Sequence, residues 1–242
     1  MHQNKILANM KVGKVSTGCQ IAFPSTVLME LMGIGGIDFV LIDGEHGTFS
    51  WEAIDDMCRV ANLAEVTPIA RVPNIESSTI LRYLDRGIQG VFGPGIDSRE
   101  DAQQLVDACY YAPKGTRGLG GAPRAAAYAN LADLDYIKRA NAEMFVVAFL
   151  EHITALENLD EIMEVEGIHA YYVGPQDMSV SMGLGGKPDH PRIKEASSLV
   201  RKAAEERGRK YLGTDIFVAD RASNFFLNGI AAFMESHKDK LV

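Results

Sequence analysis

Residues 66–93, VTPIARVPNIESSTILRYLDRGIQGVFG, contain two short apolar runs separated by a stretch with helical periodicity. The runs VTPIAR (66–71) and GVFG (90–93) are apolar and bounded by Gly, Pro or Asn, which is typical of buried strands. Between them, SSTILRYLDRG (77–87) repeats apolar residues about every 3.6 positions and ends at a glycine, which is typical of an amphipathic helix. A strand, a helix and a second strand in this order are the unit of a parallel α/β sheet.

The same alternation runs through the whole chain of 242 residues. The runs that we expect to form strands are 16–22, 38–42, 66–71, 90–93, 144–150, 170–174, 210–214 and 230–234. The amphipathic stretches that we expect to form helices are 50–64, 77–87, 98–112, 154–167 and 191–208. Eight strands alternating with helices predict a parallel (β/α)8 barrel that forms a single domain over residues 1–242. A doubly wound open sheet is the alternative, but GLGGAP (118–123) follows no strand and is therefore no dinucleotide-binding motif.

Composition limits the classes of function. The chain is 47% apolar and carries a net charge of −8 without clustered Lys or Arg, which argues against nucleic acid or an anionic membrane as partner. No apolar run approaches the roughly 20 residues that a membrane span needs, and the polar N-terminal segment does not read as a signal peptide. The three cysteines form no paired motif and suit a reducing compartment, so we expect a cytoplasmic protein.

Ionisable residues gather where the predicted strands end, which is where (β/α)8 barrels carry their chemistry. The stretch LIDGEHGTFS (41–50) brings Asp43, Glu45 and His46 directly after the second strand. The corresponding residues after later strands are Arg71, Glu151, His152, Asp177 and Asp215. We therefore predict a pocket at this rim of the barrel.

Two carboxylates suggest the chemistry of that pocket. Glu151 and Asp177 follow adjacent strands, so they must share a proton, pair with a cation or bind a metal. A hard divalent ion such as Mg²⁺ or Mn²⁺ would leave positions for the oxygens of a 2-oxo acid. Arg71 would hold a substrate anion or stabilise enolate charge, and His46 would move a proton. Taken singly, each residue also suits a helix start, a turn, a surface histidine or a rim salt bridge. The combination at one rim is what favours a site.

Five segments together resemble the metal-dependent (class II) 4-hydroxy-2-oxo-acid aldolases of the HpcH/HpaI family. They are DFVLIDGEHG (38–47), ARVPN with LRYLDRGIQGV (70–91), YYAPKGTRGLGG (110–121), LEHITALENLDEIMEVEGI (150–168) and YYVGPQDMSVSMGLGGKPDHP (171–191). The likeness covers nearly the whole chain. It implies a (β/α)8 barrel of the phosphoenolpyruvate/pyruvate type and one divalent ion, which would be Mg²⁺, Mn²⁺ or Co²⁺. It further implies cleavage of a 4-hydroxy-2-oxo acid to pyruvate, or a close 2-oxo acid, and an aldehyde through a metal-bound enolate.

The resemblance also assigns roles to residues by matching position. Glu151 and Asp177 would bind the metal, and Arg71 would contact the pyruvyl oxygen. His46 would transfer the proton, and Asp85 would orient His46 and raise its basicity. Backbone amides over 174–177 would help to hold the substrate carboxylate. The predicted substrate-binding residues are thus Arg71, Phe149, Gly174, Pro175, Gln176 and Asp177.

The sequence departs from the family pattern beside the substrate. Phe149 stands where the family commonly has a Gln, and Gln176 stands where a small residue is usual. Our hypothesis is that Gln176 takes over part of the role of the lost Gln, while Phe149 adds an apolar wall. In FGPGI (92–96), Gly93 and Gly95 would either enlarge the pocket or let the backbone approach a ligand.

The last departure concerns assembly. The sequence ends at Val242, about where the last helix of the family would begin, so we expect that helix to be short or missing. That helix often exchanges between subunits of the family hexamer. We therefore expect a homo-oligomer of this chain, but not necessarily the hexamer.

Three functions remain open at this point. The first is the aldolase. The second is a same-fold enolate enzyme that acts as a citrate-synthase-like condensing enzyme or an oxaloacetate decarboxylase, which the changes at Phe149 and Gln176 make worth testing. The third, a non-catalytic binding protein, predicts loss of the metal carboxylates or of His46, and the sequence keeps them.

Overall fold

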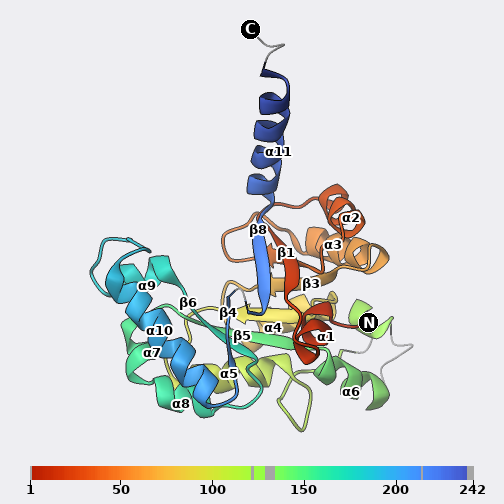
Figure 1. Cartoon of the computed structure of the whole chain (residues 1–242). Coiled ribbons are helices and arrows are strands. Elements are labelled where there is room, and N and C mark those ends of the chain that lie inside the picture. The colour runs from red at the N-terminus through yellow and green to blue at the C-terminus, as the bar shows by residue number, and fades with distance from the viewer. Residues whose placement is uncertain (1, 121–122, 129–133, 214, 239–242) are drawn as a thin grey trace.

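The fold is organised around one parallel sheet of eight strands, seen in Figure 1. The computed structural model describes residues 2–120, 123–128, 134–213 and 215–238. The strand order is β7-β6-β5-β4-β3-β2-β1-β8. The strands are β1 Ser16–Ile21, β2 Phe39–Asp43, β3 Thr67–Arg71, β4 Gly90–Gly93, β5 Phe145–Leu150, β6 Ala170–Val173, β7 Lys210–Tyr211 and β8 Phe217–Arg221. The predicted parallel α/β architecture is therefore confirmed.

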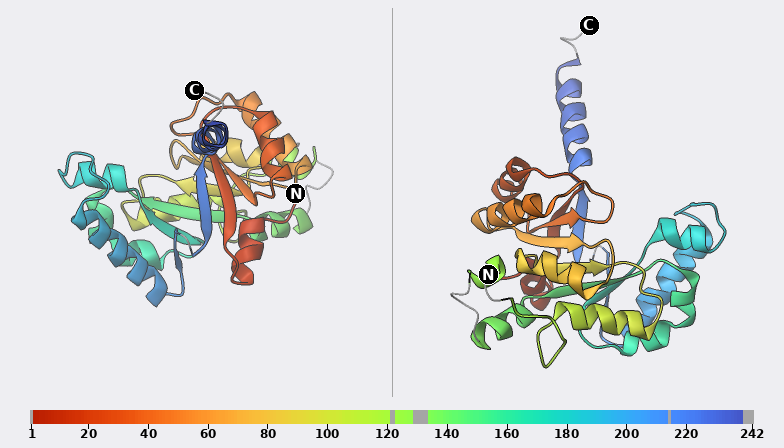
Figure 2. Two further views of the ribbon diagram at one scale, coloured as in Figure 1. Left: turned by 45° about the horizontal axis from the view of Figure 1, so that its top comes forward. Right: turned by 180° about the vertical axis from the view of Figure 1, so that it is seen from behind.

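Helices cover the outer side of this sheet, which curls so that β1 and β8 run in a clearly different direction from β4 and β5 (Figures 1 and 2). The helices are α1 Lys5–Lys11, α2 Thr26–Ile34, α3 Trp51–Leu63, α4 Ser77–Asp85, α5 Arg99–Cys109, α6 Leu134–Ala142, α7 Ile153–Glu157, α8 Leu159–Glu164, α9 Pro175–Ser181, α10 Pro191–Glu206 and α11 Ala222–Ser236, with a short 3₁₀ turn, η1, at Arg124–Ala126. The five amphipathic stretches predicted as helices all contain helix, the fourth being divided at Asn158 into α7 and α8. No prediction had been made for α1, α2, α6, α9 and η1.

The helices begin where side chains can cap them. Ser50 and Ser98 each accept a hydrogen bond from the backbone N–H three residues further on, which satisfies one of the free amides at the start of α3 and α5. One face of α3, which includes Ile54, Met57 and Cys58, is buried against the sheet. Apolar burial on one face thus fixes how these helices lie on the sheet.

A second apolar core lies inside the curl of the sheet. Phe39, Phe92, Phe145 and Phe149 come from β2, β4 and β5 and are nearly inaccessible to solvent. Helix α1 belongs to this inner core, since its N-cap Asn4 donates to the carbonyl oxygen of Gln89, directly before β4. Residues Ile6 and Leu7 of the same helix pack into the core. The amino-terminal ends of the strands are thereby covered, and the carboxyl ends carry the cavities described below.

The predicted eighth strand, 230–234, is wrong. These residues belong to α11, and the eighth strand is β8, Phe217–Arg221, which pairs with β1 in parallel register. A short apolar run such as IAAFM does not distinguish a strand from a helix, and here the helix begins eight residues before it, at Ala222. β8 lacks the usual signal because it is an edge strand, hydrogen-bonded to β1 on one side, and Val218 is 56% exposed.

The prediction of a short or missing last helix is wrong as well. Helix α11 has 15 residues and projects away from the rest of the chain, as Figure 1 shows at the top. Several large apolar side chains on it are exposed, including Phe226, Leu227 and Phe233. Within the described residues, no helix is both long and apolar enough to cross a membrane.

Candidate active site

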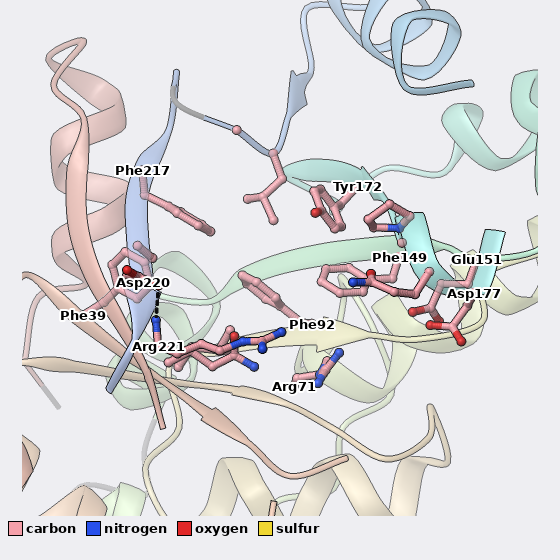
Figure 3. Close-up of a pocket in the computed structure, with 18 residues that line it drawn as sticks. Phe39, Arg71, Phe92, Phe149, Glu151, Tyr172, Asp177, Phe217, Asp220 and Arg221 are labelled. Carbon is pink, nitrogen blue, oxygen red and sulfur yellow. Dashed lines mark hydrogen bonds between the residues drawn. The ribbon is translucent and has the colours of Figure 1, made fainter. Parts of the chain in front are cut away.

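A cavity of about 390 Å³ opens at the carboxyl ends of the strands. Figure 3 shows Glu151 and Asp177 at one end of it and Asp220 at the other, with aromatic rings between them, and Arg221 reaches from the Asp220 end toward Arg71. The lining residues are Gln20, Phe39, Leu41, Arg71, Phe92, Phe149, Glu151, Tyr172, Gly174, Pro175, Gln176, Asp177, Leu212, Gly213, Phe217, Ala219, Asp220 and Arg221. All six predicted substrate-binding residues and both predicted metal ligands therefore line one cavity.

Glu151 directly follows β5, is bound by a backbone group of Gly95 and packs closely against Gly174. Its Oε2 atom accepts a hydrogen bond of 3.0 Å from the backbone N–H of Gly95, which has a φ angle of +63°. A Cβ atom on Gly174 would lie 2.7 Å from Glu151 Cγ, so glycine is required there. Burial and the neighbouring carboxylates of Glu45 and Asp177 raise the pKa of Glu151 above its ordinary value.

Asp177 lies in the first turn of α9, which follows β6 through Gly174 and Pro175. Proline suits the first helical position because the amide hydrogen that it lacks would have no partner there. Gln176 and Asp177 are both exposed and line the cavity from this helix. The connection after β6 thus turns an acidic and an amide side chain toward the space beside Glu151.

Arg71, at the end of β3, is engaged by two carboxylates. Its Nε and Nη2 atoms donate to the two oxygens of Asp43, over 3.0 and 2.6 Å, and its Nε lies 3.2 Å from Glu45 Oε2. Burial would raise the pKa of Asp43, but the hydrogen bonds from Arg71, His46 N and Gln20 hold it below its ordinary value. This bidentate contact fixes the guanidinium group at the floor of the rim.

His46 lies beside a second cavity of about 370 Å³. Its imidazole is 66% exposed, and Nε2 lies 3.9 Å from Glu45 Oε2. The second cavity is lined by Gln20, Ala22, Phe23, Asp43, His46, Arg71, Arg221, Ala222 and Ser223. Gln20, Arg71 and Arg221 line both cavities, so the two adjoin at these residues.

Asp85 does not meet His46 within one chain. It lies at the end of α4, where its Oδ1 atom is 3.3 Å from Nη2 of the buried Arg117. Burial raises the pKa of Asp85, and Arg117 offsets this only in part. Asp85 lines neither cavity. The neighbour of His46 is instead Glu45, so the structure of one chain gives no contact by which Asp85 would orient His46.

Phe149 forms part of an aromatic wall, in line with the predicted apolar contribution. Its ring centroid lies 5.5 Å from that of Phe92 and 5.0 Å from that of Tyr172. Gly93 does not enlarge this cavity, because a Cβ atom there would meet Leu105 of α5 at 2.7 Å. That glycine instead lets α5 pack closely on β4.

The cavities contain residues that the sequence did not single out. Gln20, at the end of β1, donates to Asp43 Oδ2 over 2.8 Å and could have been found from its place at a predicted strand end. Asp220 and Arg221 end β8, and the misplaced last strand hid them. Glu45 follows the second strand, and one of its oxygens is buried without a hydrogen bond but lies 3.2 Å from Arg71 Nε.

The residues present fit a hard divalent ion. Glu151 and Asp177 supply carboxylate oxygens, and Glu45 adds further negative charge close by, as the raised pKa of Glu151 reflects. Such a concentration of carboxylates is what a bound cation would relieve. In the part of the chain that the structure describes, no three His, Cys, Asp or Glu side chains are grouped closely enough to enclose an ion. A set of two carboxylates leaves coordination positions for water and substrate oxygens.

Replacing Gly174 by alanine should displace Glu151. The added Cβ would lie 2.9 Å from the Oε1 atom, and the carboxylate would have to leave its place beside Gly95. We expect Gly174→Ala to lower kcat/KM about 10- to 100-fold, the effect of losing a group that positions a metal ligand. Gly118→Ala is the control, since its Cβ would meet only Leu81, at 3.8 Å. Equal activity of both variants in a pyruvate aldol assay would contradict the placement of Glu151.

Comparison with known proteins identifies the class. The family model described as HpcH/HpaI aldolase/citrate lyase matches residues 17–236. The chain therefore belongs to the HpcH/HpaI family, and it is an enzyme, a carbon–carbon lyase.

Individual relatives agree with this membership. The chain is 34% identical over 192 residues to a hydroxypyruvate/pyruvate aldolase of Agrobacterium fabrum, with 79% of this chain and 71% of that protein covered. It is 30% identical over 207 residues to a 4-hydroxy-2-oxo-heptane-1,7-dioate aldolase of Escherichia coli, with 86% and 79% covered. A solved structure described as a citrate synthase matches with a TM-score of 0.84 and 23% identity, covering 98% of each chain, which shows a shared fold.

Proposed function

We propose that this enzyme is a divalent-metal-dependent aldolase that cleaves a 4-hydroxy-2-oxo acid to pyruvate, or a close 2-oxo acid, and an aldehyde. The observation that carries the proposal is the meeting of two cavities at Arg71. One contains Glu151 and Asp177, and the other contains His46. A 4-hydroxy-2-oxo acid needs both environments, since its oxo group and its hydroxyl group lie two carbons apart.

The proton transfers belong to His46. Imidazole exchanges protons near neutral pH, and this one is exposed at the cavity edge. As base it takes the proton of the C4 hydroxyl group. The C3–C4 bond then breaks, C4 becomes the aldehyde carbon, and the electron pair passes to C3 and into the C2 oxo group as an enolate. Return of a proton to C3 completes pyruvate.

Arg71 and the two carboxylates handle the charge that develops on the C2 oxygen. A divalent ion held by Glu151 and Asp177 would polarise the 2-oxo group and neutralise negative charge. Arg71 lines the same cavity, and Asp43 fixes its guanidinium group. Groups fixed in advance stabilise an oxyanion without reorganising during the reaction. Backbone amides over 174–177 and the Phe149 ring complete the pyruvyl side.

Exchange of the pyruvate methyl protons in heavy water tests this chemistry without choosing an aldehyde. Protein treated with a chelator should show no exchange, and Mg²⁺, Mn²⁺ or Co²⁺ should restore it. Addition of an aldehyde should then give the 4-hydroxy-2-oxo acid. Absence of exchange with every ion would refute the enolate chemistry.

The condensing and decarboxylating alternatives have weaker support. The two relatives described above, at 34% and 30% identity, are named as aldolases, whereas the citrate synthase shares the fold at 23% identity. Oxaloacetate and acyl donors belong in the same assay as competing substrates. If the protein released CO₂ from oxaloacetate faster than it formed the aldol product, the decarboxylase would be the better supported function.

Gln176 provides a prediction about substrate binding. It lines the first cavity from the first turn of α9, next to Asp177. The family commonly has a Gln at the position of Phe149. If the amide of Gln176 replaces it, Gln176→Ala should raise KM for pyruvate about 5- to 10-fold, which is the effect expected from the loss of one hydrogen bond. Gln103→Ala, on the exposed face of α5, is the control. Unchanged kinetic constants for Gln176→Ala would refute the hypothesis.

The curled sheet supports the finer assignment to a (β/α)8 barrel of the phosphoenolpyruvate/pyruvate type, formed by a single domain. The eight parallel strands, the alternating helices and an inner core of aromatic residues agree with it. The three cysteines are free and buried, which favours a cytoplasmic location.

The same proposal includes a homo-oligomer, with a second copy of the chain covering α11. Phe226, Ile230 and Phe233 are spaced to share one face of this helix and are 70%, 45% and 61% exposed. Phe226→Asp combined with Phe233→Asp should lower the mass measured by light scattering to that of a smaller species. Asn228→Asp, on the same helix, should leave it unchanged. A monomeric wild-type protein would contradict the proposal.

A further inference from the structure

Arg221 has a position that the proposed chemistry does not use. It ends β8, directly before α11, and lines both cavities. Among the described residues that line either cavity, Arg71 and Arg221 are the only lysine or arginine side chains. Arg71 is already engaged by Asp43 and Glu45. The guanidinium group of Arg221 makes no hydrogen bond or ion pair with any described residue.

Asp220, the neighbouring residue in the sequence, makes no ion pair with the Arg221 guanidinium group among the described residues. Asp220 Oδ1 accepts the backbone N–H of Arg221 at 2.7 Å and the side-chain amide of Asn224 at 2.6 Å. These two contacts hold the Asp220 carboxylate at the start of α11. The negative charge of Asp220, and that of Asp43 in the second cavity, disfavours a bound anion, so a ligand must contact the guanidinium group directly to be held.

The proposed reaction fixes which part of the substrate can reach Arg221. The C1 carboxylate and C2 oxo group belong beside Glu151 and Asp177, at the opposite end of the first cavity from the end of β8 that carries Arg221 (Figure 3). The C4 hydroxyl group must reach His46, which lines the second cavity. The aldehyde half, which continues beyond C4, therefore enters the second cavity toward Arg221.

The rest of the second cavity limits the chemistry of that half. Ala22, Phe23 and Ala222 contribute apolar surface, and Arg221 contributes a cation. A short carbon chain with a negative group at its far end matches both features. A neutral aldehyde would leave the guanidinium group without a partner when the cavity is filled.

We propose that Arg221 is a specificity residue that binds a terminal anionic group, a carboxylate or a phosphate, on the aldehyde half of the substrate. The inference rests on the proposed aldolase function, since the orientation of the substrate comes from it. A charge-assisted contact of this kind discriminates strongly, because a substrate without the anion forfeits the whole contact.

The test compares pairs of aldehydes with equal carbon chains in the aldol addition of pyruvate. The pairs are 4-oxobutanoate with butanal, and glyceraldehyde 3-phosphate with glyceraldehyde. For the wild-type protein we expect the anionic member of at least one pair to have the higher kcat/KM. Arg221→Met should lower the anionic-to-neutral ratio about 10- to 100-fold, and Arg221→Lys should restore part of it. The pair with the larger change identifies carboxylate or phosphate.

Arg192→Met is the matched control. Arg192 is also exposed and directly adjoins the start of a helix, α10, but it lines neither cavity. The anionic-to-neutral ratio of kcat/KM for Arg192→Met should equal that of the wild-type protein. An unchanged ratio in Arg221→Met, or an equal fall in Arg192→Met, would overturn the proposal.

A binding measurement separates this proposal from the proposed function. Calorimetric titration with butanoate and with inorganic phosphate requires no turnover. Arg221→Met should weaken binding of one of them about 10-fold, with no change in Arg192→Met. If the wild-type protein neither exchanges pyruvate protons nor forms an aldol, the aldolase function fails, and the titration alone decides whether Arg221 binds an anion. Equal binding by all three proteins would then overturn the role of Arg221.

Discussion

Replacing Glu151 by glutamine should abolish most of the catalytic activity while leaving the fold intact. Glu151 supplies one of the two carboxylates proposed to bind the divalent ion, and glutamine keeps its shape without its charge. We expect proton exchange of pyruvate to fall about 100-fold or more, as for other groups that stabilise developing charge. The metal concentration required for half-maximal activity should rise in parallel.

The fold should tolerate this change because the charge of Glu151 is unfavourable in the metal-free protein. Glu45 and Asp177 repel it and burial disfavours it, so its pKa is raised. The amide oxygen of glutamine can still accept the hydrogen bond from Gly95. Thermal unfolding without metal should therefore occur at the same or a higher temperature than in the wild-type protein. The control is Glu157→Gln, on the exposed side of α7. Full activity of Glu151→Gln would remove the assigned metal site.

The order of the strands could be predicted from the sequence as far as β7, and the last strand could not. β5 shows why the first part is readable, because all six of its residues are buried and form one apolar run. β8 is the opposite case, since FVADR lies at the edge of the sheet and keeps polar residues. Local sequence pattern reports burial, and an edge strand is only partly buried. The apolar residues of α11 misled the prediction because they are exposed in a single chain.

The candidate site likewise has residues that could be predicted from the sequence and residues that could not. Arg71, Glu151 and Asp177 lie at or shortly after the ends of strands that were identified correctly, and they line one cavity. Family membership, inferred from the motifs that contain them, is confirmed by the match over residues 17–236. Their catalytic roles remain predictions. Arg221 was invisible to this approach because its strand was not recognised.

Asp85 illustrates a different limit. Its role beside His46 rests on matching position and stays a prediction, because a matching position does not say which neighbour a side chain will have. Here the neighbour is Arg117, a buried arginine from the segment after α5. Such a contact joins residues 32 positions apart and leaves no periodic trace in the sequence.

Replacing Arg71 by methionine should cost both activity and stability. The loss of its positive charge beside the developing enolate should lower kcat/KM about 100-fold or more. The substitution also leaves Asp43, which is 3% exposed, without its bidentate partner. An unpaired buried carboxylate is costly, and we expect the free energy of unfolding to fall by about 2–3 kcal/mol. Arg59→Met, which breaks the exposed ion pair with Asp55 on α3, should change it by less than about 1 kcal/mol.

A second substitution separates the two effects. Asp43→Asn in the Arg71→Met background removes the unpaired charge, while the asparagine oxygen can still accept the backbone N–H of His46, as Asp43 does over 3.1 Å. Stability, measured by urea unfolding, should return to within about 1 kcal/mol of the wild-type protein, because replacing both members of a buried pair costs far less than breaking it. Activity should stay low, since the cation is still absent. Recovery of activity together with stability would mean that Arg71 only supports the loop around His46, and its assignment to the enolate oxygen would then be wrong.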